Sequence, residues 1–292
     1  MAEEDGAECS SAVAHIDCTQ LKFRRYRVEL LGVELAFWAT SDAEDVRIDG
    51  CTVAVDEGCS PQPLASELFA TAETPGEKIR AGMVFPPVGA LCSALRQRLN
   101  AVPPQSTQAT AASTPRVRLL ELGAGVGLAG LWSAVMCGTE VVLSDRSLAA
   151  LELLRRNAAL VNDAVGARAG CNGGSATRPL VHVESLSWDE RPSWLEGAFD
   201  VVAASEVMYE QGQAQLVFGA ASVALRAGGH LVIAETVRDH MRHKIDWQRD
   251  LFPAARTFGL ELFGEIDLNA ANGTSRVVTF VRGDPSSAAA GC

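Results

Sequence analysis

The stretch Glu121-Leu-Gly-Ala-Gly-Val-Gly-Leu-Ala-Gly130 decides the fold of this 292-residue chain. It ends a short apolar run, Val117 to Leu122, and it leads into a pattern with helical spacing. Gly123, Gly125 and Gly127 permit a tight turn and let a ligand approach the backbone closely. The sequence therefore predicts a strand–turn–helix unit whose turn binds a ligand.

The spacing of this turn leaves two ligands open. Gly125, Gly127 and Gly130 also satisfy the GxGxxG pattern of nicotinamide enzymes, and Asp145 stands where such an enzyme binds ribose. Glu121, however, lies just before the turn, where a carboxylate repels a pyrophosphate. The same charge attracts the ammonium and sulfonium groups of S-adenosyl-L-methionine. We therefore favour S-adenosyl-L-methionine over NAD as the cofactor.

Strands and helices alternate on the C-terminal side of the turn, which is typical of the α/β class. We expect a doubly wound, Rossmann-like sheet of seven mostly parallel strands, with the ligand beyond their carboxyl ends. The expected strands after the turn are 140–145, 180–184, 199–204, 230–235, 260–266 and 277–281, and the expected helices are 128–137, 147–161 and 211–226.

Composition divides the rest of the chain. Apolar alternation over 22–38 predicts two strands turning at Gly32, and the spacing over 83–99 predicts a helix. Two stretches, 40–80 and 166–179, are expected to be irregular. The predicted parts are a flexible leader (1–20), an N-terminal extension packing on the core (21–100), a linker (101–115), the main domain (116–283) and a tail (284–292).

Charge and cysteine content exclude several kinds of partner. Asp and Glu number 36 against 25 Lys and Arg, a net charge of −11, whereas sequence-independent nucleic-acid binding depends on basic side chains. No apolar run approaches the roughly 18 residues of a membrane span, and the N-terminus is acidic, unlike a secretory signal. The eight cysteines lack zinc-ligand spacing. We expect no nucleic acid, no membrane, no metal, and a cytoplasmic or nuclear protein.

Four blocks, in this order, resemble the class I (seven-β-strand) S-adenosylmethionine-dependent methyltransferases. More narrowly, they resemble the group that methylates lysine in non-histone proteins, methyltransferase family 16. The blocks are Ala81–Leu91, Glu121–Gly130, Leu186–Trp188 and Ala204–Tyr209. Two residues depart from the family pattern: Phe85 replaces a usual Trp, and Glu206 replaces the Asp of an Asp-x-x-Tyr motif.

The resemblance implies a cofactor site and a reacting pair. Asp145 would bind the ribose hydroxyls, with a helix cap as its competing role, and Trp188 would pack on adenine, with plain core as its alternative. Glu206 and Tyr209 would share one face of a turn and hold the acceptor amine; alternatively, they only cap a strand. The cofactor-binding residues implied are Phe85, Glu121, Gly123, Gly125, Gly127, Asp145, Trp188, Ala204 and Ser205.

The function implied is methyl transfer from S-adenosyl-L-methionine to a side-chain nitrogen of a protein substrate, with lysine as the expected acceptor. The domain 116–283 would carry this activity. Two alternatives stay open: the same fold acting on a small molecule or on protein histidine, and a non-catalytic methyltransferase-like binding module. Asp200, at the start of the fourth strand, is expected to be a solvated carboxylate.

Overall fold

A computed structural model describes residues 22–30, 33–40, 53–57, 59–60, 62–63, 84–85, 87–102, 116–171, 180–209, 212–237, 246–270 and 273–283. The expected leader 1–20, the linker beyond Val102 and the tail 284–292 lie outside these residues. The expected division of the chain into domains stays a prediction.

One large sheet contains seven strands: β5 (Arg118–Leu122), β6 (Glu140–Asp145), β7 (Val181–Ser185), β8 (Phe199–Ser205), β9 (Leu225–Val237), β10 (Leu260–Ala270) and β11 (Gly273–Arg282). Their order is β10-β11-β9-β8-β5-β6-β7. Strands β5 to β9 are parallel, whereas β11 and β10 run antiparallel beside β9. The α/β class and the mostly parallel seven-stranded sheet are confirmed.

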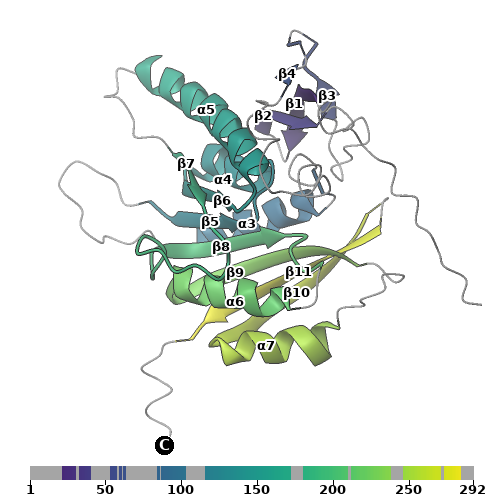
Figure 1. Cartoon of the computed structure of the whole chain (residues 1–292), viewed down its shortest axis with the longest axis vertical. Helices are drawn as coiled ribbons and strands as arrows, with labels where there is room; N and C mark the ends of the chain where they lie inside the picture. The colour runs from purple at the N-terminus through teal and green to yellow at the C-terminus, as the bar shows by residue number, and fades with distance from the viewer. Residues whose placement is uncertain are drawn as a thin grey trace, which may run out of the picture.

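Helices cover both faces of this sheet (Figure 1). Side chains alternate between the faces along each strand, so Leu119 and Val201 are buried in one core cluster and Leu120 and Val202 in the other. Burial on both faces explains why the central strands are apolar along their whole length. Three helices lie on one face, α3 (Val88–Ala101), α4 (Leu128–Cys137) and α5 (Leu148–Cys171), while α6 (Gln213–Ala224), the π-helix η3 (Trp247–Leu251) and α7 (Phe252–Thr257) belong to the other.

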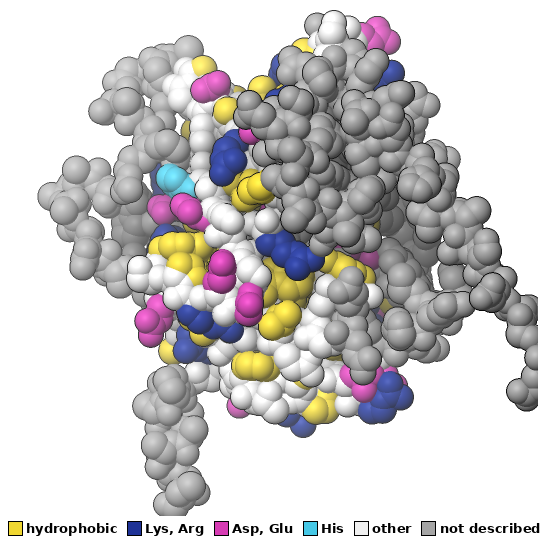
Figure 2. Space-filling view, viewed as in Figure 1, with side chains coloured by type: hydrophobic (Ala, Val, Ile, Leu, Met, Phe, Trp, Pro, Cys, Tyr) yellow, Lys and Arg dark blue, Asp and Glu magenta, His cyan; other side chains and the backbone are white. Residues whose placement is uncertain are grey.

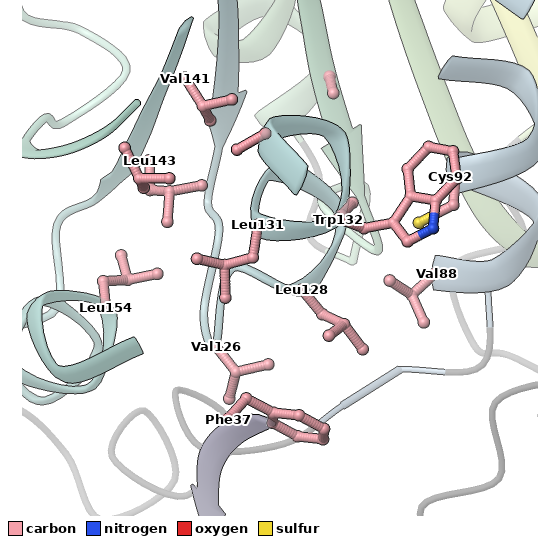
Figure 3. Close-up of a cluster of buried hydrophobic side chains, with 14 of the residues drawn as sticks. Phe37, Val88, Cys92, Val126, Leu128, Leu131, Trp132, Val141, Leu143 and Leu154 are labelled. Atoms are coloured by element: carbon pink, nitrogen blue, oxygen red, sulfur yellow. The ribbon is translucent and has the colours of Figure 1, made fainter. Parts of the chain in front are cut away.

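A second, smaller sheet is built on the hairpin β1 (Lys22–Leu30) and β2 (Val33–Thr40). The hairpin predicted from the sequence is thus confirmed. Its apolar side packs on the helices: Phe37 points toward Val126 and Leu128, beside the cluster that contains Trp132 (Figure 3). This hairpin therefore shares one hydrophobic core with the glycine turn and α4.

The stretch 40–80, expected to be irregular, contributes two short strands, β3 (Val53–Val55) and β4 (Gln62–Pro63). Both pair with β1, on the edge that β2 leaves free. An ion pair between Arg25 and Asp56, at 3.3 Å, secures the residue that follows β3. Such short strands have no periodicity of their own, so pairing with β1 defines them.

Helix α5 is longer than the sequence predicted. It continues to Cys171, through the start of the insert 166–179 that was expected to be irregular. Asn162 explains part of this difference, because its side-chain oxygen accepts hydrogen bonds from the backbone N–H groups of Leu180 and Val181 at 3.0 and 3.1 Å. The contact ties this part of the helix to β7. Ala-rich sequence around Gly166 favours continuation of the helix.

The surface seen in Figure 2 mixes its charges. Acidic and basic side chains of the described residues are interspersed with hydrophobic ones, and on this face the described basic side chains form no continuous field. Among the helices of the described residues, none is long and apolar enough to cross a membrane.

Candidate functional site

The carboxyl ends of β5, β6, β7 and β8 meet at one edge of the large sheet. Strand β5 lies between β6 and β8. After β5 the chain builds β6 and β7 on one side of it and then crosses to the other side to build β8. This is the switch point of a doubly wound sheet, where ligands bind. The segments that follow these four strands contain most of the site residues predicted from the sequence.

The glycine turn after β5 adopts a conformation that side chains disfavour. Gly123, Gly125 and Gly127 have φ angles of +61°, +55° and +77°, in the left-handed region that glycine tolerates. A Cβ atom on Gly127 would also lie 2.7 Å from Leu154 and 2.8 Å from Leu143. The structural need for glycine is confirmed, while contact of these glycines with a cofactor stays a prediction.

Asp145 ends β6 and braces the glycine turn. One carboxylate oxygen accepts a hydrogen bond from the backbone N–H of Gly125 at 3.1 Å, and the other accepts one from Ser147 at 2.9 Å. The second bond forms an Asx turn just before α5. The first turn of α5 is capped by Ser147, whose Oγ accepts a hydrogen bond from the Ala150 N–H at 3.3 Å. The competing capping role therefore belongs to Ser147, and the ribose-binding role of Asp145 stays a prediction.

Trp188 reaches the glycine turn from the loop after β7. A Cβ atom on Gly123 would lie 3.1 Å from Trp188 Cζ2 and 3.3 Å from Val207 Cγ1. Val207 follows β8, on the opposite side of β5. The indole and Val207 therefore converge on the turn from two directions. The half-buried indole packs on the core cluster of the α6 face, as its alternative role expected, and packing on adenine stays a prediction.

Glu121 points into the protein core. Its carboxyl group is buried and accepts a hydrogen bond from the backbone N–H of Gly130 at 2.8 Å. Burial raises the pKa of Glu121 to about 8, and the charge of Asp145 adds to this, although the Gly130 bond opposes it. The group is therefore mostly neutral at pH 7. The expected repulsion of a pyrophosphate by an anionic Glu121 is thus unsupported, and its role toward the cofactor stays a prediction.

The segment after β8 holds Glu206 and Tyr209. Glu206 has a φ of +53°, a strained conformation for a residue other than glycine. Its Oε1 accepts a hydrogen bond from the backbone N–H of Thr236 at 2.5 Å, which fastens it to β9. Tyr209 is 38% exposed. One Glu206 oxygen thus binds the backbone of β9, and Tyr209 is accessible at the same edge. Contact of the pair with an acceptor amine stays a prediction.

Glu235, near the end of β9, was not predicted from the sequence. Its Oε1 accepts hydrogen bonds from the backbone N–H groups of Val207 and Met208, at 2.8 and 3.1 Å. Glu206 and Glu235 therefore form a reciprocal pair. Glu235 binds the backbone just after Glu206, and Glu206 binds the backbone N–H of Thr236, just after Glu235. The available signal was an acidic residue closing the apolar run Leu231-Val-Ile-Ala234 at the carboxyl edge of the sheet.

Two buried hydroxyl groups lie at the ends of β8 and β9. Ser205 pairs with Ala234 across these strands, so Ser205 and Thr236 are on the same face of the sheet. Neither hydroxyl oxygen has a hydrogen-bond partner among the described residues. Buried hydroxyl groups are normally satisfied, so contact of Ser205 with a polar ligand stays a prediction that this place allows.

The remaining predicted residues lie at the edges of the site. Ala204 is buried in β8, next to Ser205. Phe85 is half-buried, and its carbonyl oxygen accepts a hydrogen bond from Val88 at the start of α3, 3.2 Å away. Cofactor contact stays a prediction for both residues. Among the described residues, no group of three or more His, Cys, Asp or Glu side chains is placed to hold a metal ion.

The expectation that Asp200 is solvated is wrong. Its side chain is buried at the opposite edge of the sheet, where it accepts a hydrogen bond from the backbone N–H of Arg118 at 2.7 Å and pairs with the guanidinium of Arg226. A buried carboxylate needs such partners. Asp200 is therefore a structural residue that joins β5, β8 and β9.

Several solved structures are similar to this chain. One is a geranyl diphosphate methyltransferase in complex with GPP and sinefungin (16% identity, 73% of this chain and 84% of that chain, TM-score 0.46). Another is a putative sarcosine dimethylglycine methyltransferase from Galdieria sulphuraria (14% identity, 70% of this chain and 94% of that chain, TM-score 0.45). No curated protein matches the chain.

The family assignment comes from the sequence itself. A family model described as lysine methyltransferase matches residues 90–244, slightly more than half of the chain. The match includes the glycine turn, Trp188 and the segment from Glu206 to Tyr209. It also decides between the two ligands left open above, because the methyl donor of these enzymes is S-adenosyl-L-methionine. The chain belongs to the lysine methyltransferase family.

Proposed function

We propose that this protein transfers the methyl group of S-adenosyl-L-methionine to the side-chain nitrogen of a lysine in a protein substrate. The observation that carries the proposal is the segment after β8, where the strained Glu206 and the exposed Tyr209 stand at the switch point of a lysine methyltransferase fold. Strain of this kind persists where the surrounding structure holds it, often at functional sites.

The cofactor would lie along the carboxyl edge, against residues already placed there. The glycine turn would approach it with bare backbone, Asp145 would accept hydrogen bonds from the ribose, and Trp188 would pack on adenine. Ser205 and Thr236, whose hydroxyls lack partners among the described residues, would bind the polar amino-acid end. When bound, S-adenosyl-L-methionine supplies an electrophilic methyl group on sulfur.

The protein's own residues would then act on the acceptor. Lysine is protonated at neutral pH and must lose a proton before its nitrogen can attack. Tyr209 would orient the amine, and the Glu206 carboxylate would favour transfer of the ammonium proton to water. The nitrogen lone pair forms the N–C bond as the C–S bond breaks. The electron pair of the broken C–S bond stays on sulfur. Catalysis here is mainly positioning.

We place the reaction in the cytoplasm, with the nucleus as the alternative compartment. The described cysteines Cys59, Cys92 and Cys137 are free thiols, as is usual in reducing compartments.

The test compares Glu206→Gln and Tyr209→Phe with the parent protein. Transfer of labelled methyl groups to proteins of a cell lysate is measured beside calorimetric binding of S-adenosylhomocysteine. We expect each variant to lose transfer by on the order of 10²-fold while binding stays within a few-fold. Glu196→Gln, on the exposed segment before β8, is the matched control. Full transfer by both variants would refute the role of the pair.

A further inference from the structure

The outer edge of the large sheet combines exposed apolar side chains with acidic ones. Among the described strands, β10 pairs with β11 alone and ends the sheet (Figure 1). All seven residues from Glu261 to Asp267 are exposed. Three of them are large and apolar: Leu262, Phe263 and Ile266 are 42%, 52% and 48% exposed. The Phe263 ring contacts His230 and Arg98, so Leu262 and Ile266 are the two apolar side chains offered to a partner. A free edge presents unpaired backbone N–H and C=O groups, and apolar side chains on it favour pairing with another chain.

Both faces of this edge combine an acid with an apolar residue. The register aligns Leu262 with Phe280, and Glu265 with Val278, on the α6 face. It aligns Glu261 with Val281, and Ile266 with Val277, on the α3 face. An extended partner strand presents side chains to both faces in turn. A complementary partner therefore carries basic and apolar residues on each face.

A second copy of this chain does not fit the edge. Pairing of two β10 edges would bring the exposed carboxylates Glu261 and Glu265 of both copies to one interface, where like charges repel. Each copy also has a net charge of −11. We propose that the outer edge of β10, from Glu261 to Asp267, docks an extended, basic segment of the protein substrate by strand addition. This inference rests on the proposed lysine methylation.

The strand register shows how far the edge of β10 lies from the candidate site. Asp267 pairs with Arg276 on β11, and Arg276 pairs with Glu235 on β9, whose carboxylate holds the segment after β8. A strand docked outside β10 lies four strand spacings from β8, about 19 Å. About six extended residues span that distance. The target lysine would therefore lie about six residues from the docked segment.

The test uses a fluorescent peptide that repeats Lys-Lys-Val-Val, which places lysine and valine on both faces of a strand. Its binding to the full chain is followed by anisotropy. Glu261→Lys with Glu265→Lys should weaken binding about tenfold or more. The matched control is Asp163→Lys with Glu196→Lys, which makes the same charge change at exposed residues of α5 and of the segment before β8. It should change binding less than about twofold.

Leu262→Ser with Ile266→Ser tests the apolar part of the edge. This double variant should also weaken peptide binding. An unchanged melting profile would show that it is still folded. Equal weakening in the Asp163/Glu196 control would overturn the docking edge. So would the absence of peptide binding to the parent, or a dimer of the parent that Glu261→Lys with Glu265→Lys dissociates.

Formation of methyllysine is measured in parallel on lysate proteins. If the parent forms none, the proposed function fails, and loss of peptide binding in the edge variants still supports a docking surface. If the parent forms methyllysine and the edge variants bind the peptide as tightly as the parent does, the function stands and the docking edge is wrong.

Discussion

The buried side chain of Asn157 holds the backbone of Trp38, which lies 119 residues earlier in the chain. Its Oδ1 accepts a hydrogen bond from the Trp38 N–H at 2.6 Å, and its Nδ2 donates to the Trp38 carbonyl oxygen at 3.2 Å. The same Nδ2 donates to the carbonyl oxygen of Val126 at 2.8 Å. One amide on α5 therefore joins the hairpin β1–β2 to the glycine turn.

Asn157→Ala should reduce both stability and cofactor binding. It would leave buried backbone groups of Trp38 and Val126 without their partner, at a cost of about 2–4 kcal/mol, and it would loosen the turn. Denaturant unfolding and calorimetry with S-adenosylhomocysteine measure the two effects.

The control for Asn157 is Asn162→Ala on the same helix, α5. This change removes the hydrogen bonds that Asn162 accepts from the backbone N–H groups of Leu180 and Val181. It should lower stability and leave cofactor affinity nearly unchanged. If both variants lose affinity equally, Asn157 has no special connection to the turn.

Gly127→Ala should abolish cofactor binding. The new Cβ would be strained at a φ of +77° and would lie within 2.8 Å of Leu143 and Leu154, so the turn must shift. Overpacking of this kind costs about 1–3 kcal/mol. Gly138→Ala is the control, because Gly138 has a φ of +63° with open space around its Cβ position. Unchanged S-adenosylhomocysteine affinity in Gly127→Ala would contradict the position of the turn at the cofactor.

Glu235→Ala should lower the rate of methyl transfer by on the order of 10²-fold, because Val207 and Met208 lose the acceptor that positions the segment after β8. Glu235→Gln keeps one acceptor oxygen and should restore most of the rate. We expect kcat to fall more than the affinity for S-adenosylhomocysteine, and steady-state kinetics beside calorimetry measure this difference. A loss of affinity as large as the loss of kcat would instead assign Glu235 to the cofactor.

Glu121 should make stability depend on pH. Because its pKa rises from 4.5 in the unfolded chain to about 8 in the folded protein, the folded state holds an extra proton between these values. The free energy of unfolding should therefore decrease as pH rises through this range and level off above pH 8. Glu121→Gln keeps an acceptor for Gly130 without this titration.

Urea unfolding at about pH 6 and about pH 9 measures the effect of Glu121. Relative to Glu121→Gln, the parent should lose about 3 kcal/mol between these conditions. Parallel pH dependence in the two proteins would show that the buried carboxyl does not titrate in this range.

Local signals predicted the parts of the protein that depend on local sequence. The glycine turn was predictable because only glycine tolerates its left-handed φ angles, and the apolar runs gave β5, β6 and β8 because both of their faces are buried. Asn157 and Glu235 were missed because their partners are distant in the sequence. The partners of Asn157 lie 31 and 119 residues away, and those of Glu235 lie 27 and 28 residues away.

Asp200 was misplaced for a related reason. A carboxylate beside an apolar run looks solvated when its partners are unknown, and those partners, Arg118 and Arg226, come from β5 and β9. The burial and pKa of Glu121 likewise depend on how α4 packs against β5, which the motif alone does not specify.

The most direct test of lysine methylation is the chemical identity of the product. Lysate proteins are incubated with the purified protein and S-adenosylmethionine labelled in its methyl group, then hydrolysed and separated as amino acids. We expect label in methylated lysine and its loss in Glu206→Gln. Label in methylated histidine, or none in the protein fraction, would contradict lysine methylation.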